Sequence, residues 1–125
     1  LATEYAKRHQ TFTPIPDVAM RGITLEQILE LHEFIQETLT KHDLVDVERG
    51  QRGRSVTWED LTMHQVKEHF LLPLTLPNRS SFVEAVTPGR QPPMWMVSHW
   101  WGTPFAFTMR MLQLHACSRH RHGAD

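Results

Sequence analysis

The chain has 125 residues, of which 40% are hydrophobic and 22% are charged, values that are ordinary for one globular domain. Its formal net charge of -1, without an acidic or basic tail, excludes a broad electrostatic attraction to nucleic acid or anionic lipid as the default function. The single cysteine, Cys117, excludes an intrachain disulfide, and no run of residues approaches the ~20 apolar positions that a membrane-spanning helix needs.

Residues 1–22 are predicted to form an extended N-terminal arm, ahead of a single small helical domain over residues 23–118 and a polar tail over residues 119–125. Pro14 and Pro16 force the residues before them out of the helical region of backbone conformation. Such an arm becomes ordered only where a partner surface holds it. We therefore predict that Pro14 and Pro16 contact a partner protein.

The first predicted helix covers residues 24–41. Thr24 and Gln27 have the spacing of a capping box, in which each side chain accepts a hydrogen bond from the backbone N–H of the other residue. Apolar residues then recur at helical spacing, while glutamates occupy the other faces. The apolar residues of this stripe are Leu25, Ile28, Leu29, Leu31, Phe34, Ile35 and Leu39.

Two further helices are expected before the proline-rich connector that ends near residue 93. The second helix begins at Thr57, with Asp60 three residues later, and it stops at Pro73 because proline cannot continue a helix. The third is short and begins at Ser81, where the letters "SFVE" give another capping box.

Residues 94–98, "MWMVS", are predicted as a strand because they are short, apolar and bounded by prolines on one side and by Gly102 on the other. Thr103 then caps a last helix, with Pro104 at its first position, where a missing N–H does no harm. That helix, "PFAFTMRMLQLHAC", is apolar nearly all the way round. We therefore expect it to be buried on most sides.

These elements predict a mainly α protein with three to four helices and one short strand. A strand followed by a buried helix is also how an α/β domain begins, so the first βα unit of an incomplete α/β domain is the alternative. A parallel sheet needs further strands and crossovers, which these residues do not supply. Either the helices cover the strand on their own, or another chain supplies the missing surface.

The turn between the strand and the last helix is the candidate site. Backbone N–H groups at a helix N-terminus, here those of Phe105 and Ala106, attract anions. The His99 imidazole supplies a switchable charge or a proton, and the neighbouring indoles offer flat faces to a ligand. Ligand or partner contacts are therefore predicted for Ser98, His99, Trp100, Trp101, Gly102, Thr103 and Phe105.

A structural role for the same turn is the preferred interpretation. Ser98 and His99 would then satisfy backbone groups at the turn, and His99 would stay neutral because the aromatic rings around it restrict water. The tryptophans would fill core and interface. We expect at least one of Trp95, Trp100 and Trp101 to be buried in the chain's own core, and we place Trp95 among the partner contacts.

No metal site, cofactor or catalytic arrangement is predicted. His115, Cys117, His120 and His122 form the one cluster of metal-binding residue types, but their spacing does not match that of zinc ligands and no second half lies elsewhere. Cys117 has no residue that would orient a base beside it, and the chain has no glycine-rich phosphate loop. We therefore expect a protein that is not an enzyme.

Residues 80–116 resemble a largely uncharacterised domain of dinoflagellate proteins, in which "S[FY]VE" precedes a "QPP.WFVSHWWG.P" core and a helix that ends near "HA". The matching positions are Ser81–Glu84, Gln91–Pro93, Val97–Gly102, Pro104 and His115–Ala116. This resemblance implies an algal protein, and one setting for such a protein is a plastid assembly such as a photosystem. More distantly, the strand and last helix are similar to the start of TIR-type domains, whose NAD-cleaving members need a glutamate on a later element.

The sequence thus predicts a non-catalytic binding or accessory subunit of a larger assembly, such as an algal plastid photosystem complex. Its expected partners are other protein subunits, with no nucleic acid and no membrane span, and contact with a membrane complex is compatible with this view. The Trp and Met content is typical of protein interfaces. An intracellular location is expected, in a plastid on the dinoflagellate resemblance. The alternative is a TIR-like or nucleotide-binding signalling module, with its ligand site at the turn of residues 98–106.

Overall fold

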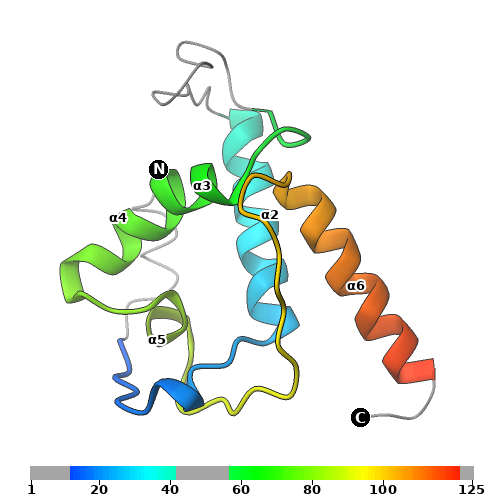
Figure 1. The fold of residues 1–125 in the computed structure, drawn as a ribbon. Helices are drawn as coiled ribbons and strands as arrows, with labels where there is room; N and C mark the ends of the chain where they lie inside the picture. Colours follow the sequence, from blue (N-terminus) through cyan, green and yellow to red (C-terminus); the bar gives the residue numbers. More distant parts are fainter. Residues whose placement is uncertain (1–11, 42–56, 122–125) are drawn as a thin grey trace.

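The computed structural model describes residues 12–41 and 57–121, and this part of the chain is mainly helical (Figure 1). In chain order the elements are η1 (Val18–Met20), α2 (Leu25–Lys41), α3 (Met63–Val66), η2 (Lys67–Leu71), α4 (Leu72–Thr75), η3 (Leu76–Asn78), α5 (Phe82–Val86) and α6 (Phe105–Arg121). Here η1 and η3 are 3-10 helical turns and η2 is a π-helical turn. The prediction of a mainly α protein is confirmed.

Two capping boxes form where the sequence predicts them. At the start of α2, the Gln27 N–H donates to Thr24 Oγ1 at 3.1 Å and the Thr24 N–H donates to Gln27 Oε1 at 3.0 Å. At the start of α5, the Glu84 N–H donates to Ser81 Oγ at 3.4 Å and the Ser81 N–H donates to Glu84 Oε1 at 3.0 Å. Both helices therefore begin within one residue of their predicted starts.

The second helical region begins later than predicted. Thr57 starts only a turn, in which its hydroxyl donates to Asp60 Oδ2 at 3.0 Å. Leu61 then enters the core with no exposed surface, and this turns the chain away from a helical path. α3 begins after Thr62, which forms a capping box with Gln65 that the sequence analysis did not single out. The predicted start at Thr57 is therefore wrong.

Pro73 does not stop the helical path, contrary to the prediction. In η2 the hydrogen-bond register widens, and the Leu72 N–H donates to the Lys67 carbonyl five residues earlier. Pro73 consequently falls in the first turn of α4. Proline is tolerated there because the first N–H groups of a helix have no carbonyl partner within it. The chain continues far enough to place Leu74 in the core.

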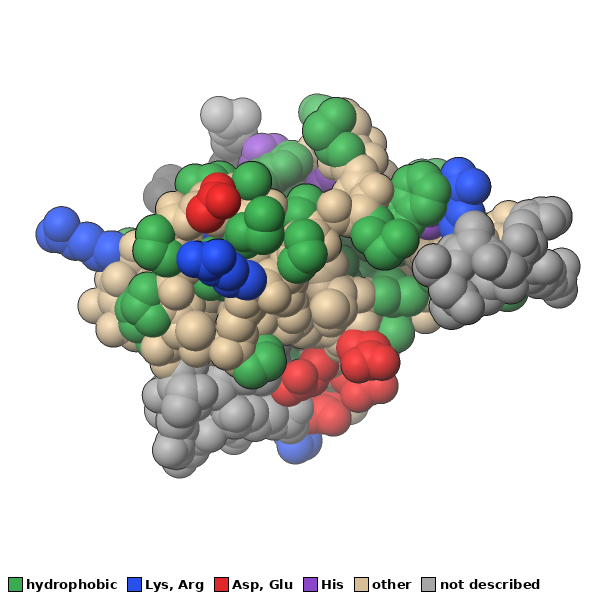
Figure 2. Space-filling view, turned by 90° about the horizontal axis from the view of Figure 1, so that it is seen from below, with side chains coloured by type: hydrophobic (Ala, Val, Ile, Leu, Met, Phe, Trp, Pro, Cys, Tyr) green, Lys and Arg blue, Asp and Glu red, His purple; other side chains and the backbone are tan. Residues whose placement is uncertain are grey.

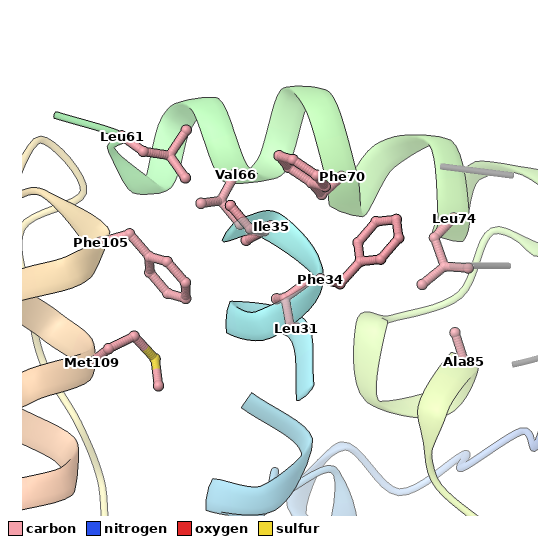
Figure 3. Close-up of a cluster of buried hydrophobic side chains, with 10 residues drawn as sticks. All are labelled: Leu31, Phe34, Ile35, Leu61, Val66, Phe70, Leu74, Ala85, Phe105 and Met109. Atoms are coloured by element: carbon pink, nitrogen blue, oxygen red, sulfur yellow. The ribbon is translucent and has the colours of Figure 1, made fainter. Parts of the chain in front are cut away.

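The hydrophobic core lies between α2, the α3–α4 region and the first turns of α6 (Figure 3). The Phe34 and Phe70 rings meet edge to face, with 6.0 Å between their centroids. α6 enters the core through Phe105 and Met109. The buried residues of the cluster are Leu31, Phe34, Ile35, Leu61, Val66, Phe70, Leu74, Ala85, Phe105 and Met109.

The described part of the predicted arm, residues 12–22, is held by the chain itself rather than by a partner. Ile15 is 1% exposed, and its N–H donates to Glu84 Oε2 of α5 at 2.8 Å. Pro14 and Pro16 stand exposed on either side of Ile15, as alternation along an extended backbone requires. The idea of an arm that only a partner orders is wrong for this stretch, while the contacts predicted at the two prolines stay predictions.

A polar network joins this N-terminal stretch to the chain after α5. The Gly22 N–H donates to the Gln91 carbonyl at 2.7 Å, and the Gln91 N–H donates to the Met20 carbonyl at 2.8 Å. The Gln91 side-chain amide donates to the Gly22 carbonyl and to Gln27 Oε1, both at 2.9 Å. The residue that caps α2 is thus also tied to Gln91.

Residues 94–98 do not form the predicted strand. They are extended and exposed, and they pair with no other segment of the described chain. The nearest features to a sheet in residues 12–41 and 57–121 are two isolated bridges, one between Arg21 and Gln91 and one between Thr62 and Pro104. The backbone N–H and C=O groups of a strand need hydrogen-bond partners on a second strand, and helices do not offer such partners. No sheet therefore supports the alternative of a βα unit.

Candidate functional site

The exposed apolar side chains of the described residues gather in one part of the chain. Nine of the thirteen large hydrophobic residues that are exposed lie between residues 94 and 114. Exposed apolar residues that are scattered singly need no explanation, whereas a contiguous group marks an interaction site, and here the contact of Trp95 with His115 joins the two stretches that carry these residues. We call these nine residues the outer apolar surface: Met94, Trp95, Met96, Val97, Trp100, Trp101, Phe107, Met111 and Leu114.

α6 contributes one whole side to this surface. Phe107, Met111 and Leu114 recur at intervals of four and three residues, so they share one side of the helix, and they are 57%, 51% and 54% exposed. Phe105 and Met109 are offset by two residues, face the opposite way and are buried. The prediction that this helix is buried on most sides is wrong, because the described chain covers only the side with Phe105 and Met109.

Trp95 holds the extended segment against the C-terminal half of α6, where the two run beside each other (Figure 1). Its ring meets the His115 ring edge-on, with 5.1 Å between centroids. The Arg119 guanidinium lies over the indole, 4.4 Å from its centroid, a cation–π contact that contributes ~0.5–1 kcal/mol at an exposed site. The ring is still 50% exposed, so it remains accessible to a partner.

Trp100 and Trp101, the other two tryptophans of residues 94–101, also pack against groups of the protein. A Cβ atom on Gly102 would overlap the Trp100 ring, so the indole lies directly on that glycine. The Trp101 ring meets the His64 ring edge-on at 5.5 Å, and the Trp101 carbonyl accepts a hydrogen bond from the backbone of α3. Trp100 is 74% exposed and Trp101 is 40% exposed.

No tryptophan of residues 94–101 is therefore buried in the chain's own core, and that prediction is wrong. Trp58 packs there instead. Its ring lies edge-on against Phe105, with 6.0 Å between centroids, and 4.4 Å from the ring of His32. Trp58 precedes Leu61, and the insertion of Leu61 into the core brings the Trp58 indole between α2 and α6.

His99 is not the buried structural histidine that we expected. His99 and Ser98 are both exposed, and no hydrogen bond, ion pair or ring contact within the described residues holds either side chain. Among the described histidines, His32 is partly shielded from water by the ring of Trp58. Burial lowers the pKa of His32, and the carboxylate of Glu33 acts in the opposite direction. The aromatic residues next to His99 in the sequence do not shield it from water, because their rings pack against other groups.

The start of α6 offers less to an anion than predicted. The Phe105 N–H, one of the two expected donors, donates to the Leu61 carbonyl. The Phe105 side chain lies in the core, so it is out of reach of a ligand at the surface. Gly102 and Thr103 are partly exposed, and the Thr103 N–H donates to the Trp100 carbonyl at 3.0 Å.

Charge is divided unevenly between the two long helices. α2 carries four glutamates, whereas α6 carries none, and the sequence contains no Asp or Glu from Ala85 to Arg121. Arg110 and His115 lie on α6 on either side of the stripe of apolar residues that faces outward. Seen from below, most of the acidic side chains in view gather at one edge of the molecule, and hydrophobic side chains are spread over much of the rest of that face (Figure 2). The apolar stripe of α6 is thus flanked by Arg110 and His115 and by no carboxylate of its own helix.

Within residues 12–41 and 57–121, no three His, Cys, Asp or Glu side chains come close enough together to hold a metal ion. Cys117 is exposed, and His122 lies outside the described residues. No helix in this part of the chain is both long enough and apolar enough to cross a bilayer.

No protein-family model matches the sequence, and neither the curated proteins nor the solved structures include a match. The resemblances to a dinoflagellate domain and to TIR-type domains therefore stay predictions. What the chain does has to be inferred from its own surface.

Proposed function

We propose that this chain is a non-catalytic binding or accessory subunit that docks onto another protein through the outer apolar surface. One observation carries the proposal: nine exposed large hydrophobic side chains lie within residues 94–114. Each Å² of apolar surface that a partner removes from water stabilises the complex by about 25 cal/mol before the costs of association.

The composition and order of this surface support the same function. Aromatic residues and Met are enriched in protein interfaces, and the outer apolar surface consists mainly of these types. The indole of Trp95 is already held by Arg119 and His115, so docking immobilises fewer free side chains. The dinoflagellate resemblance is the sole support for a plastid assembly, such as a photosystem, as the setting.

The test compares two exposed leucines. Leu114 belongs to the outer apolar surface and is 54% exposed, whereas Leu76 lies in η3 and is 63% exposed. In a native extract of the source cells, the wild-type chain is expected to migrate with a large assembly on gel filtration. Leu114→Glu is expected to release it as a free chain, because a buried charge at the interface is strongly unfavourable. The matched variant Leu76→Glu is expected to stay in the assembly.

Circular dichroism of both purified variants is the control for folding, and each is expected to retain the helical spectrum of the wild type. The proposal fails if the wild-type chain migrates alone at its own mass. It also fails if the two variants leave the assembly to the same extent, because the outer apolar surface would then have no special role.

A further inference from the structure

The outward side of α6 has the residue spacing by which one helix packs against another. Phe107, Met111 and Leu114 form a ridge at i, i+4 and i+7, and all three are about half exposed. Arg110 and His115 flank this ridge, at the positions that face the charged residues of a partner in paired helices. The ridge and its flanks together describe one half of a helix pair.

A second copy of this chain does not complete the pair. α6 carries Arg110 and Arg119 but no acidic residue, so two α6 helices side by side would bring arginines together with no carboxylate to pair with them. Like charges across a helix interface oppose pairing. α2 has the glutamates but not the apolar side, because its Leu31 and Phe34 are already buried in the core.

An anionic lipid surface also fits this ridge less well than a helix does. Tryptophans anchor proteins in lipid when their rings reach into the interface between headgroups and chains. Here the indoles turn onto groups of the protein: Trp95 onto Arg119 and Trp101 onto His64. The side chains that project most regularly are those of the α6 ridge, and their spacing is that of helix packing.

We infer that the partner presents an amphipathic helix whose apolar stripe is flanked by Asp or Glu residues, and that this helix packs along the outer side of α6. The inference rests on the proposed docking function and names the chemistry of the partner. The apolar stripe of the partner covers Phe107, Met111 and Leu114. Its carboxylates pair with Arg110, which lies directly beside this ridge.

Two synthetic peptides of about 18 residues, or five helical turns, test the inference. Both carry leucines at i, i+4, i+7 and i+11; one has glutamates at the flanking positions and the other has lysines. Each is labelled with fluorescein and titrated with the full chain, and binding is followed by fluorescence anisotropy. The glutamate peptide is expected to bind at least tenfold more tightly than the lysine peptide. Its affinity is expected to fall as salt is raised, because ions screen the charge pairs.

Charge reversal on the chain provides the matched controls. Arg110→Glu is expected to reverse the preference, so that the lysine peptide binds more tightly than the glutamate peptide. Arg79→Glu alters an exposed arginine at the end of η3, in the stretch between α4 and α5. These two helices lie on the opposite side of α2 from α6 (Figure 1). Arg79→Glu is expected to leave both affinities within a factor of about two. Circular dichroism verifies that each variant keeps its helical content.

The alternative outcomes are distinct. Equal binding of both peptides overturns the charge inference but leaves the proposed docking function in place. Failure of both peptides to bind also overturns it, and the assembly experiment with Leu114→Glu then decides the proposed function separately. If neither peptide binds and vesicles of phosphatidylcholine with phosphatidylserine do, the surface recognises lipid and the inferred helix is wrong.

Discussion

At Gly102 and Gly22 the missing side chain leaves room for two different kinds of neighbour. A Cβ on Gly102 would meet the ring of Trp100, which is largely exposed and can swing away. A Cβ on Gly22 would lie 2.5 Å from the Gln91 carbonyl oxygen and 3.0 Å from the Pro93 nitrogen, both backbone atoms that cannot move alone. Gly102 thus makes room for an indole at the surface, whereas Gly22 allows its own chain segment to pack closely against the segment of Gln91 and Pro93.

We therefore expect the two alanine variants to differ in stability. Gly22→Ala should lower the free energy of unfolding by ~1–3 kcal/mol, because overpacking forces the backbone to shift. Gly102→Ala should change it by no more than ~0.5 kcal/mol but should move the Trp100 ring into water and shift the tryptophan emission to longer wavelength. Urea denaturation and fluorescence measure both effects. Equal losses of stability would contradict the contrast between ring and backbone.

Glu84 of α5 holds several polar groups around one buried carboxylate. Its carboxylate accepts hydrogen bonds from the N–H groups of Ile15 and Ser81 and from the Ser81 hydroxyl, and Arg21 lies 3.6 Å away. The Ile15 N–H is the largest cause that lowers the pKa of Glu84, followed by the Ser81 N–H. Desolvation of the buried carboxylate opposes these effects but does not overcome them.

A carboxyl group whose pKa is lowered by folding stabilises the fold above its unfolded pKa, which is about 4.3 for Glu. That contribution is lost as the pH falls from there through the lower pKa of the folded state. Glu84→Gln should lower the free energy of unfolding by ~1–3 kcal/mol at pH 7, and this deficit should shrink as the pH approaches 3. Melting temperatures from pH 7 to pH 3 measure it. The matched variant Glu59→Gln, at an exposed carboxylate outside the helices, should change the free energy of unfolding at pH 7 by no more than ~0.5 kcal/mol.

At the scale of elements, the predictions that succeeded depend on residues close together in the sequence. The capping boxes of α2 and α5 each involve two residues three apart, so neither needs knowledge of the rest of the fold. The strand at residues 94–98 failed because a strand exists only with a partner segment, which composition cannot supply. In α6, periodicity gives two apolar sides but cannot say which one the core covers.

The two sides of α6 should respond differently to the same truncation. Met109→Ala removes a side chain that is 1% exposed and should lower the free energy of unfolding by ~2–5 kcal/mol. Met111→Ala, two residues away on the outer side, should change it by ~0.5 kcal/mol or less. Chemical denaturation of the isolated chain measures both values. A similar cost at Met111 would mean that the chain itself covers the outer side of α6.

At the scale of the whole molecule, the candidate site was only partly accessible from sequence. The concentration of Trp and Met in residues 94–101 is visible in the sequence, and the structure shows that these side chains are exposed. The sequence did not indicate that Trp58, rather than one of these tryptophans, packs beside Phe105. The sequence shows directly that residues Ala85 to Arg121 include no Asp or Glu. What this implies for a partner depends on which side of α6 faces outward, and the sequence does not give that.

An uncovered apolar side should make the isolated chain associate with itself nonspecifically. We expect light scattering to detect aggregation at micromolar concentrations. Replacement of Phe107, Met111 and Leu114 together by Gln should reduce it while circular dichroism shows the same helical content, because Gln is a good helix former. A wild-type chain that stays monomeric and melts cooperatively, like its triple variant, would argue against an uncovered interface.

The contacts of Glu84 and Gln91 also set an order of events during translation. The Ile15 N–H and the Glu84 carboxylate are 69 residues apart in sequence, as are Gln91 and Gly22. A growing chain emerges N-terminus first, so Ile15 has no site to enter until α5 has left the ribosome. α2 can form early from its own capping box, whereas the stretch translated before it waits for residues made much later. The first described residues to be synthesised are thus among the last to reach their final positions.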